Sequence, residues 1–176
     1  KQEPRLMNWL EATRAVAHAT VAAVITFNQV HNGELGMNSL ILFGVLYLAA
    51  SLGTHLLDKR HKLMSPRLGL PVFAPTLVAI TALVLVFTKV NQIVAFRWLT
   101  AALALGFVIT ELWLANKVGR KTVDGRDAII TAFVSLALLG LTAGIDVGQV
   151  PMVGFFGAFH TILAVHLGIS ATSPKK

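Results

Sequence analysis

Long uncharged apolar stretches run through most of this sequence and limit what it can fold into. One crossing of the hydrocarbon layer of a membrane by an α-helix needs about 20 mostly apolar residues. The chain has 176 residues, of which 55% are hydrophobic and 13% are charged, whereas soluble domains carry about 25% charged residues. The length leaves room for six crossings and for no sizeable soluble domain. The sequence therefore predicts an all-α, polytopic integral membrane protein.

Six transmembrane helices, joined as three hairpins, are predicted within a single domain that covers residues 1–176. Gly, Asn, Asp and Pro residues interrupt the apolar stretches and mark the connections between them. The predicted spans are 9–28, 38–57, 72–88, 96–116, 128–145 and 150–171.

Lys and Arg residues are divided unequally between the two ends of these predicted helices. Thirteen of the 15 lie on the side of the two termini and of the connections near Lys62 and Lys121, and only Lys89 and Arg97 lie on the other. Because Lys and Arg accumulate in cytoplasmic loops, we predict a multi-pass protein of the plasma (cytoplasmic) membrane with both termini in the cytoplasm. This orientation accounts for the net charge of +7 without a nucleic acid partner.

Small residues at four-residue spacing mark candidate packing faces, since membrane helices associate through close packing more than through the hydrophobic effect. Such a face serves either contacts inside this chain or the docking of another membrane chain. The dipeptide Phe-Gly also occurs twice, at 43–44 and 156–157, which hints at a duplicated hairpin. The candidate faces are Gly140, Gly144 and Gly148 in the fifth predicted helix and Ala15, Ala19 and Ala23 in the first.

The alanine series of the first predicted helix resembles the AxxxA contact of the substrate-binding subunits of energy-coupling-factor transporters. Those subunits also have six helices, a similar size and both termini inside. The resemblance implies docking on a larger membrane protein and binding of a vitamin. The outer loops of this sequence depart from that expectation, because they are too short to cover much of such a solute.

Acidic and basic residues inside the predicted spans are candidate functional residues, because a charge at membrane depth costs at least a few kcal/mol. Glu111 precedes Lys117 by six residues, which places it about 9 Å deeper in the membrane. A structural pairing, with Arg14 or a histidine, and a proton relay are equally open for Glu111. Glu11 and Arg14 share a helix face and are expected to pair near the cytoplasmic boundary, where long side chains reach the headgroups.

Four histidines fall at two depths, His18 with His160 near mid-membrane and His55 with His166 nearer the cytoplasm. His160 and His166 are separated by a rise of about 9 Å and point about 120° apart, so they cannot share one iron. Two haems do not fit, but one bis-histidine haem held by His18 and His160 is an alternative. The favoured interpretation is that neutral histidines form hydrogen bonds between helices, with His18 and Glu111 as candidate partners of His160.

Catalytic signatures are missing from the sequence. Without cysteine there are no thiolate nucleophiles, Cys-ligated zinc sites or iron–sulfur clusters. The motifs of nucleotide-binding loops, serine hydrolases and zinc proteases are also missing. We therefore expect no catalytic residues and no metal or cofactor. The first hypothesis is a non-catalytic subunit that contacts lipids and packs against other membrane chains or copies of itself. The alternatives are a permease or substrate-binding transport component for small solutes or ions, and a b-type cytochrome with haem b.

Overall fold

The computed structural model describes residues 9–57, 70–145 and 147–173. These ranges contain six α-helices and no strand, so all six predicted helices are present. The helices are α1 (Trp9–Phe27), α2 (Gly33–Leu57), α3 (Leu70–Val86), α4 (Gln92–Val118), α5 (Val123–Gly144) and α6 (Gln149–Thr172).

Polar caps explain why three helices begin earlier than predicted. The side chain of Asn32 accepts a hydrogen bond from the backbone N–H of Leu35 at 2.9 Å, at the start of α2. The side chain of Asn91 accepts two backbone N–H groups at the start of α4. Thr122 caps α5 by accepting the N–H of Gly125 at 3.0 Å. Each cap satisfies N–H groups that have no partner inside the helix, so these polar residues belong to helix starts.

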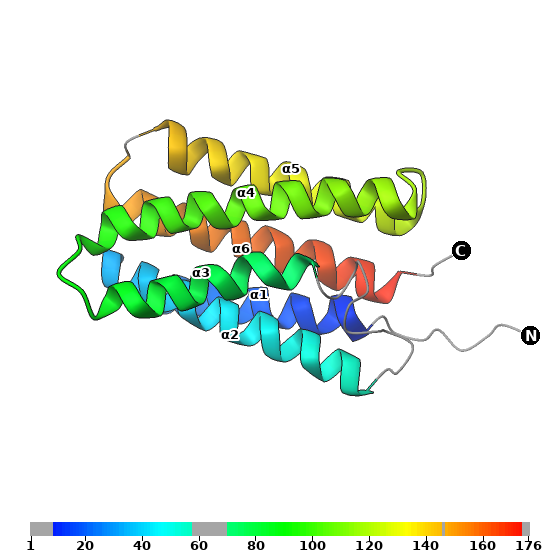
Figure 1. The fold of residues 1–176 in the computed structure, drawn as a ribbon, viewed down its shortest axis with the longest axis horizontal. Coiled ribbons are helices and arrows are strands. Elements are labelled where there is room, and N and C mark those ends of the chain that lie inside the picture. The colour runs from blue at the N-terminus through cyan, green and yellow to red at the C-terminus, as the bar shows by residue number, and fades with distance from the viewer. Residues whose placement is uncertain (1–8, 58–69, 146, 174–176) are drawn as a thin grey trace, which may run out of the picture.

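Consecutive helices run in opposite directions, and α1, α3 and α5 end where α2, α4 and α6 begin, at the left of Figure 1. Each helix contacts its neighbours in the sequence, and α1 also contacts α6, which closes the bundle into a ring. In addition, α2, α4 and α6 contact one another. The interior of the bundle is therefore built around these three helices, with α1, α3 and α5 between them.

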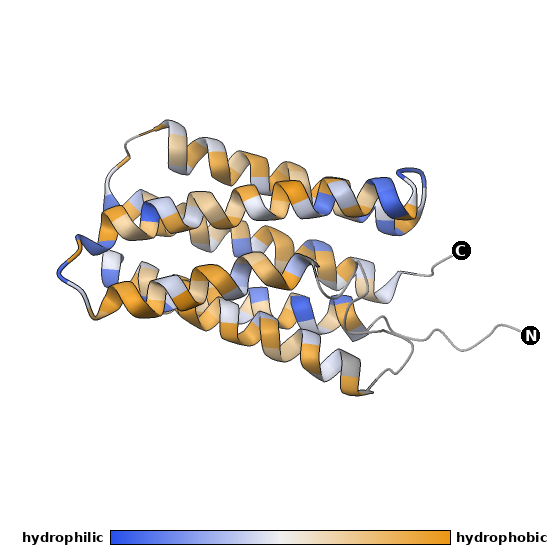
Figure 2. Ribbon diagram, in the orientation of Figure 1, coloured by the Kyte–Doolittle hydropathy of each residue, from blue (hydrophilic) through white to orange (hydrophobic). Residues whose placement is uncertain are grey.

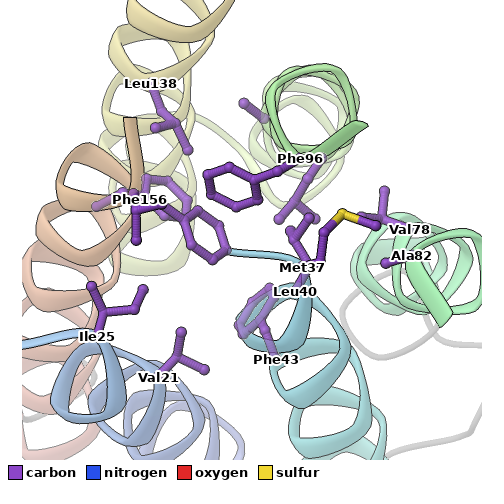
Figure 3. Packing of buried hydrophobic residues seen from close by; sticks show 14 of the residues in the cluster. Val21, Ile25, Met37, Leu40, Phe43, Val78, Ala82, Phe96, Leu138 and Phe156 are labelled. Carbon is purple, nitrogen blue, oxygen red and sulfur yellow. The ribbon is translucent and has the colours of Figure 1, made fainter. Parts of the chain in front are cut away.

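The apolar core receives side chains from all six helices (Figure 3). Phe43 of α2, Phe96 of α4 and Phe156 of α6 are fully buried in it. The ring centroids of Phe96 and Phe156 lie 5.5 Å apart, in an edge-to-face arrangement that aromatic pairs favour. Large aromatic side chains thus fill the centre where α2, α4 and α6 meet.

The two Phe-Gly dipeptides lie at close contacts between helices. A Cβ atom at Gly44 would stand 2.2 Å from the Cβ of Ala79 and 2.6 Å from the carbonyl oxygen of Pro75, so only glycine allows α2 and α3 to pack at this distance. A Cβ atom at Gly157 would lie 2.9 Å from the side chain of Ile25, between α6 and α1.

Large apolar side chains are exposed on the outside of the bundle, and Figure 2 shows apolar residues along most of each helix. Four helices, α2, α4, α5 and α6, are long and apolar enough to cross a membrane. Of the other two, α3 is apolar but has only 17 residues, and α1 carries Glu11 and Arg14. Since soluble monomers rarely expose contiguous apolar surface of this extent, the chain is a membrane-embedded helical bundle.

Candidate functional site

A small polar cavity lies inside the bundle, at the end where α1 and α5 begin. Its volume is about 30 Å³, which is room for one or two water molecules. Asp124, Asp127 and Glu11 line it and are partly exposed, whereas the other polar residues of the lining lie deeper. The remaining lining residues are Arg14, His18, Tyr47, Phe107, Glu111, Leu114, Ala128, Thr131 and Leu167.

Arg14 and Glu111 form the charged part of the deep lining. The exposed fractions of their side chains are 4% and 6%, so both are shielded from the outside by neighbouring helices. Arg14 interacts electrostatically with Tyr47, Glu11 and Glu111, and its guanidinium carbon lies 5.1 Å from the centre of the Tyr47 ring. Arg14 is thus buried in a cluster of ionisable groups that includes Glu11, and a close ion pair of Glu11 and Arg14 at the membrane boundary stays a prediction.

His18 and His160 meet at the inner end of the cavity. The two Nδ1 atoms lie 2.8 Å apart in a buried hydrogen bond between α1 and α6. In such a bond one imidazole donates its Nδ1–H and the other accepts with a bare Nδ1. The structure thus joins the two histidines that the sequence places at the same depth, and it forms the bond between helices that the sequence predicts for His160.

Aromatic rings surround this pair of imidazoles. The centroids of the Phe43 and Phe156 rings each lie 4.4 Å from that of His160, and Phe43 also lies 4.8 Å from His18. A set of phenylalanine rings in mutual contact packs around the pair and fills the bundle beyond it, and one of them, Phe107, also lines the cavity. We call this set the aromatic layer; it consists of Phe43, Phe96, Phe107, Phe156 and Phe159.

The geometry of His18 and His160 differs from that of a bis-histidine haem. Metal–nitrogen bonds of about 2 Å would place two axial nitrogen atoms about 4 Å apart, on opposite sides of one iron. The observed Nδ1–Nδ1 distance is 2.8 Å, and aromatic rings occupy the surrounding space. A haem would therefore require α1 and α6 to separate. Among the described residues, no group of three or more His, Asp or Glu side chains could hold a metal ion.

The other histidines singled out in the sequence lie apart from this pair. His166 is half-buried on α6, and its Nε2 lies 3.3 Å from the carbonyl oxygen of Asp127 and 4.0 Å from its carboxylate. Ser170, one turn further along α6, donates a hydrogen bond to the same carboxylate. These contacts tie α6 to the start of α5. The side chain of His55 lies outside the described residues.

The predicted packing faces are mostly exposed on this chain. A Cβ atom at Gly140, Gly144 or Gly148 would meet no other atom within 4 Å, so these glycines mark no contact inside the described bundle. In the alanine series of α1, Ala15 is buried whereas Ala19 and Ala23 are exposed.

Two parts of the cavity lining were not predicted from the sequence. Tyr47 lies in a continuous apolar stretch of the sequence. Its contact with a charged group becomes visible only in the fold, where the guanidinium of Arg14 packs over its ring. Asp124 and Asp127 belong to a charged segment that the sequence places in a connection, but α5 begins at Val123 and carries both inward. The spacing of Asp127 from the apolar residues of α5 is the signal that could have identified it.

No protein-family model, curated protein or solved structure matches this chain.

Proposed function

We propose that this protein is a small-cation permease that crosses the cytoplasmic membrane six times. The observation that carries the proposal is the cavity in which Glu111 and Arg14 are buried at membrane depth. Charged residues at such depth are costly and are kept mainly where they bind or conduct something. Four carboxyl side chains and one guanidinium line the cavity, a balance that favours a cation over an anion.

The volume of the cavity restricts the cation further. About 30 Å³ accommodates a water molecule or an ion of similar size but no organic solute. A vitamin, which the resemblance to energy-coupling-factor subunits implies, would not fit. A permease for ions is one of the alternatives predicted from the sequence, and the small cavity restricts the transported ion to a small inorganic cation.

Six crossings agree with the way α1 and α3 pack. The charged residues of α1 face the cavity, so their presence does not require α1 to lie outside the membrane. At 1.5 Å per residue, the 17 residues of α3 span about 26 Å, close to the thickness of the hydrocarbon layer of about 30 Å. The distribution of Lys and Arg supports cytoplasmic termini, so the cavity would open toward the cytoplasm.

Reconstitution into liposomes tests this function. Purified protein is placed in vesicles that contain dyes for H⁺, Na⁺ or K⁺, and a gradient of one cation is imposed. Wild type is expected to raise the flux of at least one cation above that of empty vesicles, and Glu111→Gln is expected to abolish the increase. Glu34→Gln, at an exposed position on α2, is the matched control and should conduct as wild type. Equal flux in protein-containing and empty vesicles would rule the permease out.

A second proposal is the non-catalytic subunit that the sequence favours. The observation in its support is the exposed pair Gly140 and Gly144, which leaves a smooth face at the end of α5 for another membrane helix, whereas Gly148 of the predicted series lies outside α5, at the start of α6. A partner chain should then remain bound during purification in mild detergent, and Gly144→Leu should release it. Purification of wild type as a chain without partners would contradict this proposal.

A further inference from the structure

The inner end of the cavity is closed by a hydrogen bond. His18 lines the cavity, and the imidazole behind it, that of His160, is fully buried and joined to it through the 2.8 Å contact between the Nδ1 atoms. No metal ion can pass between two nitrogen atoms at this distance. A proton can, because a hydrogen bond between imidazoles already holds one proton between a donor and an acceptor.

Two buried polar groups face the cavity without a direct partner among the described residues. No hydrogen bond or ion pair of the Glu111 carboxyl group is found among the described residues, although Arg14 influences this group electrostatically. Nε2 of His18 is also free, since the hydrogen bond of this ring uses Nδ1. Water molecules in buried cavities typically form about three hydrogen bonds to such groups, so a water in this cavity can link Glu111 to His18.

We propose that the cation carried by this protein is the proton, and that Glu111, His18 and His160 hold it in turn. The inference rests on the permease function proposed above and names its substrate. The fixed positive charge of Arg14 beside the cavity disfavours a metal cation at rest there, whereas a proton can pass along hydrogen bonds from His18 to His160, away from Arg14.

The proton moves in three balanced steps. Glu111 in its acid form gives a proton to the cavity water as that water gives one of its own to Nε2 of His18. The proton on Nδ1 of His18 then shifts to Nδ1 of His160, which leaves His18 neutral and His160 positively charged. Glu111, now a carboxylate, takes a new proton by way of water from the entrance, where Asp124 and Asp127 lie.

The aromatic layer determines where the proton stops. Nε2 of His160 has no hydrogen-bond partner among the described residues, and the rings of Phe43 and Phe156 stand against this imidazole. A proton on His160 can therefore leave toward the opposite end of the bundle only when the aromatic layer opens. His160 is therefore the innermost residue that holds the proton, and the aromatic layer is the barrier to its further movement.

Proton flux in dye-loaded liposomes tests the inference in the full-length protein. Glu111→Gln, His18→Gln and His160→Gln should each reduce proton flux to the level of empty vesicles, because an amide forms hydrogen bonds but does not pass a proton on. His31→Gln is the matched control: it changes a histidine in the connection between α1 and α2, at the end of the bundle away from the cavity, and it should leave the flux unchanged. Thermal melting of each variant in detergent shows that it is folded.

The outcomes separate this inference from the permease function. Flux of Na⁺ or K⁺ without proton flux would overturn the inference and leave the permease standing, whereas no flux of any cation would overturn both. Normal proton flux in folded His18→Gln or His160→Gln would also overturn the inference. Should a variant not fold, ¹⁵N-histidine NMR of wild type replaces it. In that spectrum, ring-nitrogen signals that keep one Nδ1 atom permanently protonated and the other permanently bare would contradict a proton shared between His18 and His160.

Discussion

The bond between His18 and His160 is an unusual way to join two membrane helices, because each imidazole depends on the other. Both rings are buried among aromatic side chains, which limits the access of water to the two Nδ1 atoms. A buried polar group left without a partner costs about 1–3 kcal/mol. The pair therefore contributes to stability mainly through the penalty for breaking it.

This dependence leads to a prediction for His160. Replacement by Leu should destabilise the protein by about 1–3 kcal/mol, because it leaves Nδ1 of His18 unsatisfied. Replacement by Gln should cost less, since the amide can still donate or accept. Thermal or denaturant unfolding in detergent measures the difference, and equal stability of the two variants would show that the hydrogen bond does not contribute.

Some of the site could be predicted from the sequence because helix geometry converts position into depth. His18 and His160 fall at similar distances from their helix ends, which makes His18 a candidate partner of His160 beside Glu111. The burial of Arg14 under the ring of Tyr47 could not be obtained in the same way. It depends on the rotation of α1 against α2, and hydrophobic periodicity gives little information on rotation when most faces of a helix are apolar.

At the scale of the helices, the glycines that lie at close helix contacts differ from those that regular spacing in the sequence predicts. Gly140 and Gly144 have the regular spacing of a packing face, yet α5 turns them outward. Gly44 belongs to no such series, yet it lies at the crossing with α3, whereas Gly157, which has Thr161 four residues later, lies at the crossing with α1. Regular spacing shows that residues share one face of a helix, but it does not show which neighbour, if any, that face meets.

Gly44 and Gly140 accordingly predict opposite results for the same substitution. Gly44→Ala should destabilise the protein by about 1–3 kcal/mol, because its methyl group meets backbone and side-chain atoms of α3 that cannot give way. Gly140→Ala meets nothing within 4 Å and should leave the melting temperature unchanged or slightly higher, since alanine favours the helix. Equal melting temperatures of the two variants would contradict the close crossing of α2 and α3.

At the scale of the whole molecule, the number, type and order of the helices could be predicted because each apolar stretch is bounded by polar residues that stop or cap it. The contacts among α2, α4 and α6 could not. They depend on which apolar faces fit together, and many arrangements of six helices bury similar areas of similar side chains.

The predicted orientation has a direct test, because the chain contains no cysteine. Lys121 and Lys89 are exposed at opposite ends of the bundle and can each be replaced by Cys. An impermeant thiol reagent added to intact cells should label Lys89→Cys and should label Lys121→Cys only after the cells are opened. The reverse pattern would place the cavity entrance on the outer face of the membrane.

The contact between α1 and α6 joins the first and last helices of the chain, and this has a consequence for biosynthesis. A ribosome that adds about 5–20 residues per second needs several seconds after α1 is complete before α6 emerges. During that interval His18 has no His160, and Arg14 lacks the shelter of the finished bundle. The nascent chain must therefore be held at the insertion machinery, or its first helix must wait near the membrane surface, until the last helix arrives.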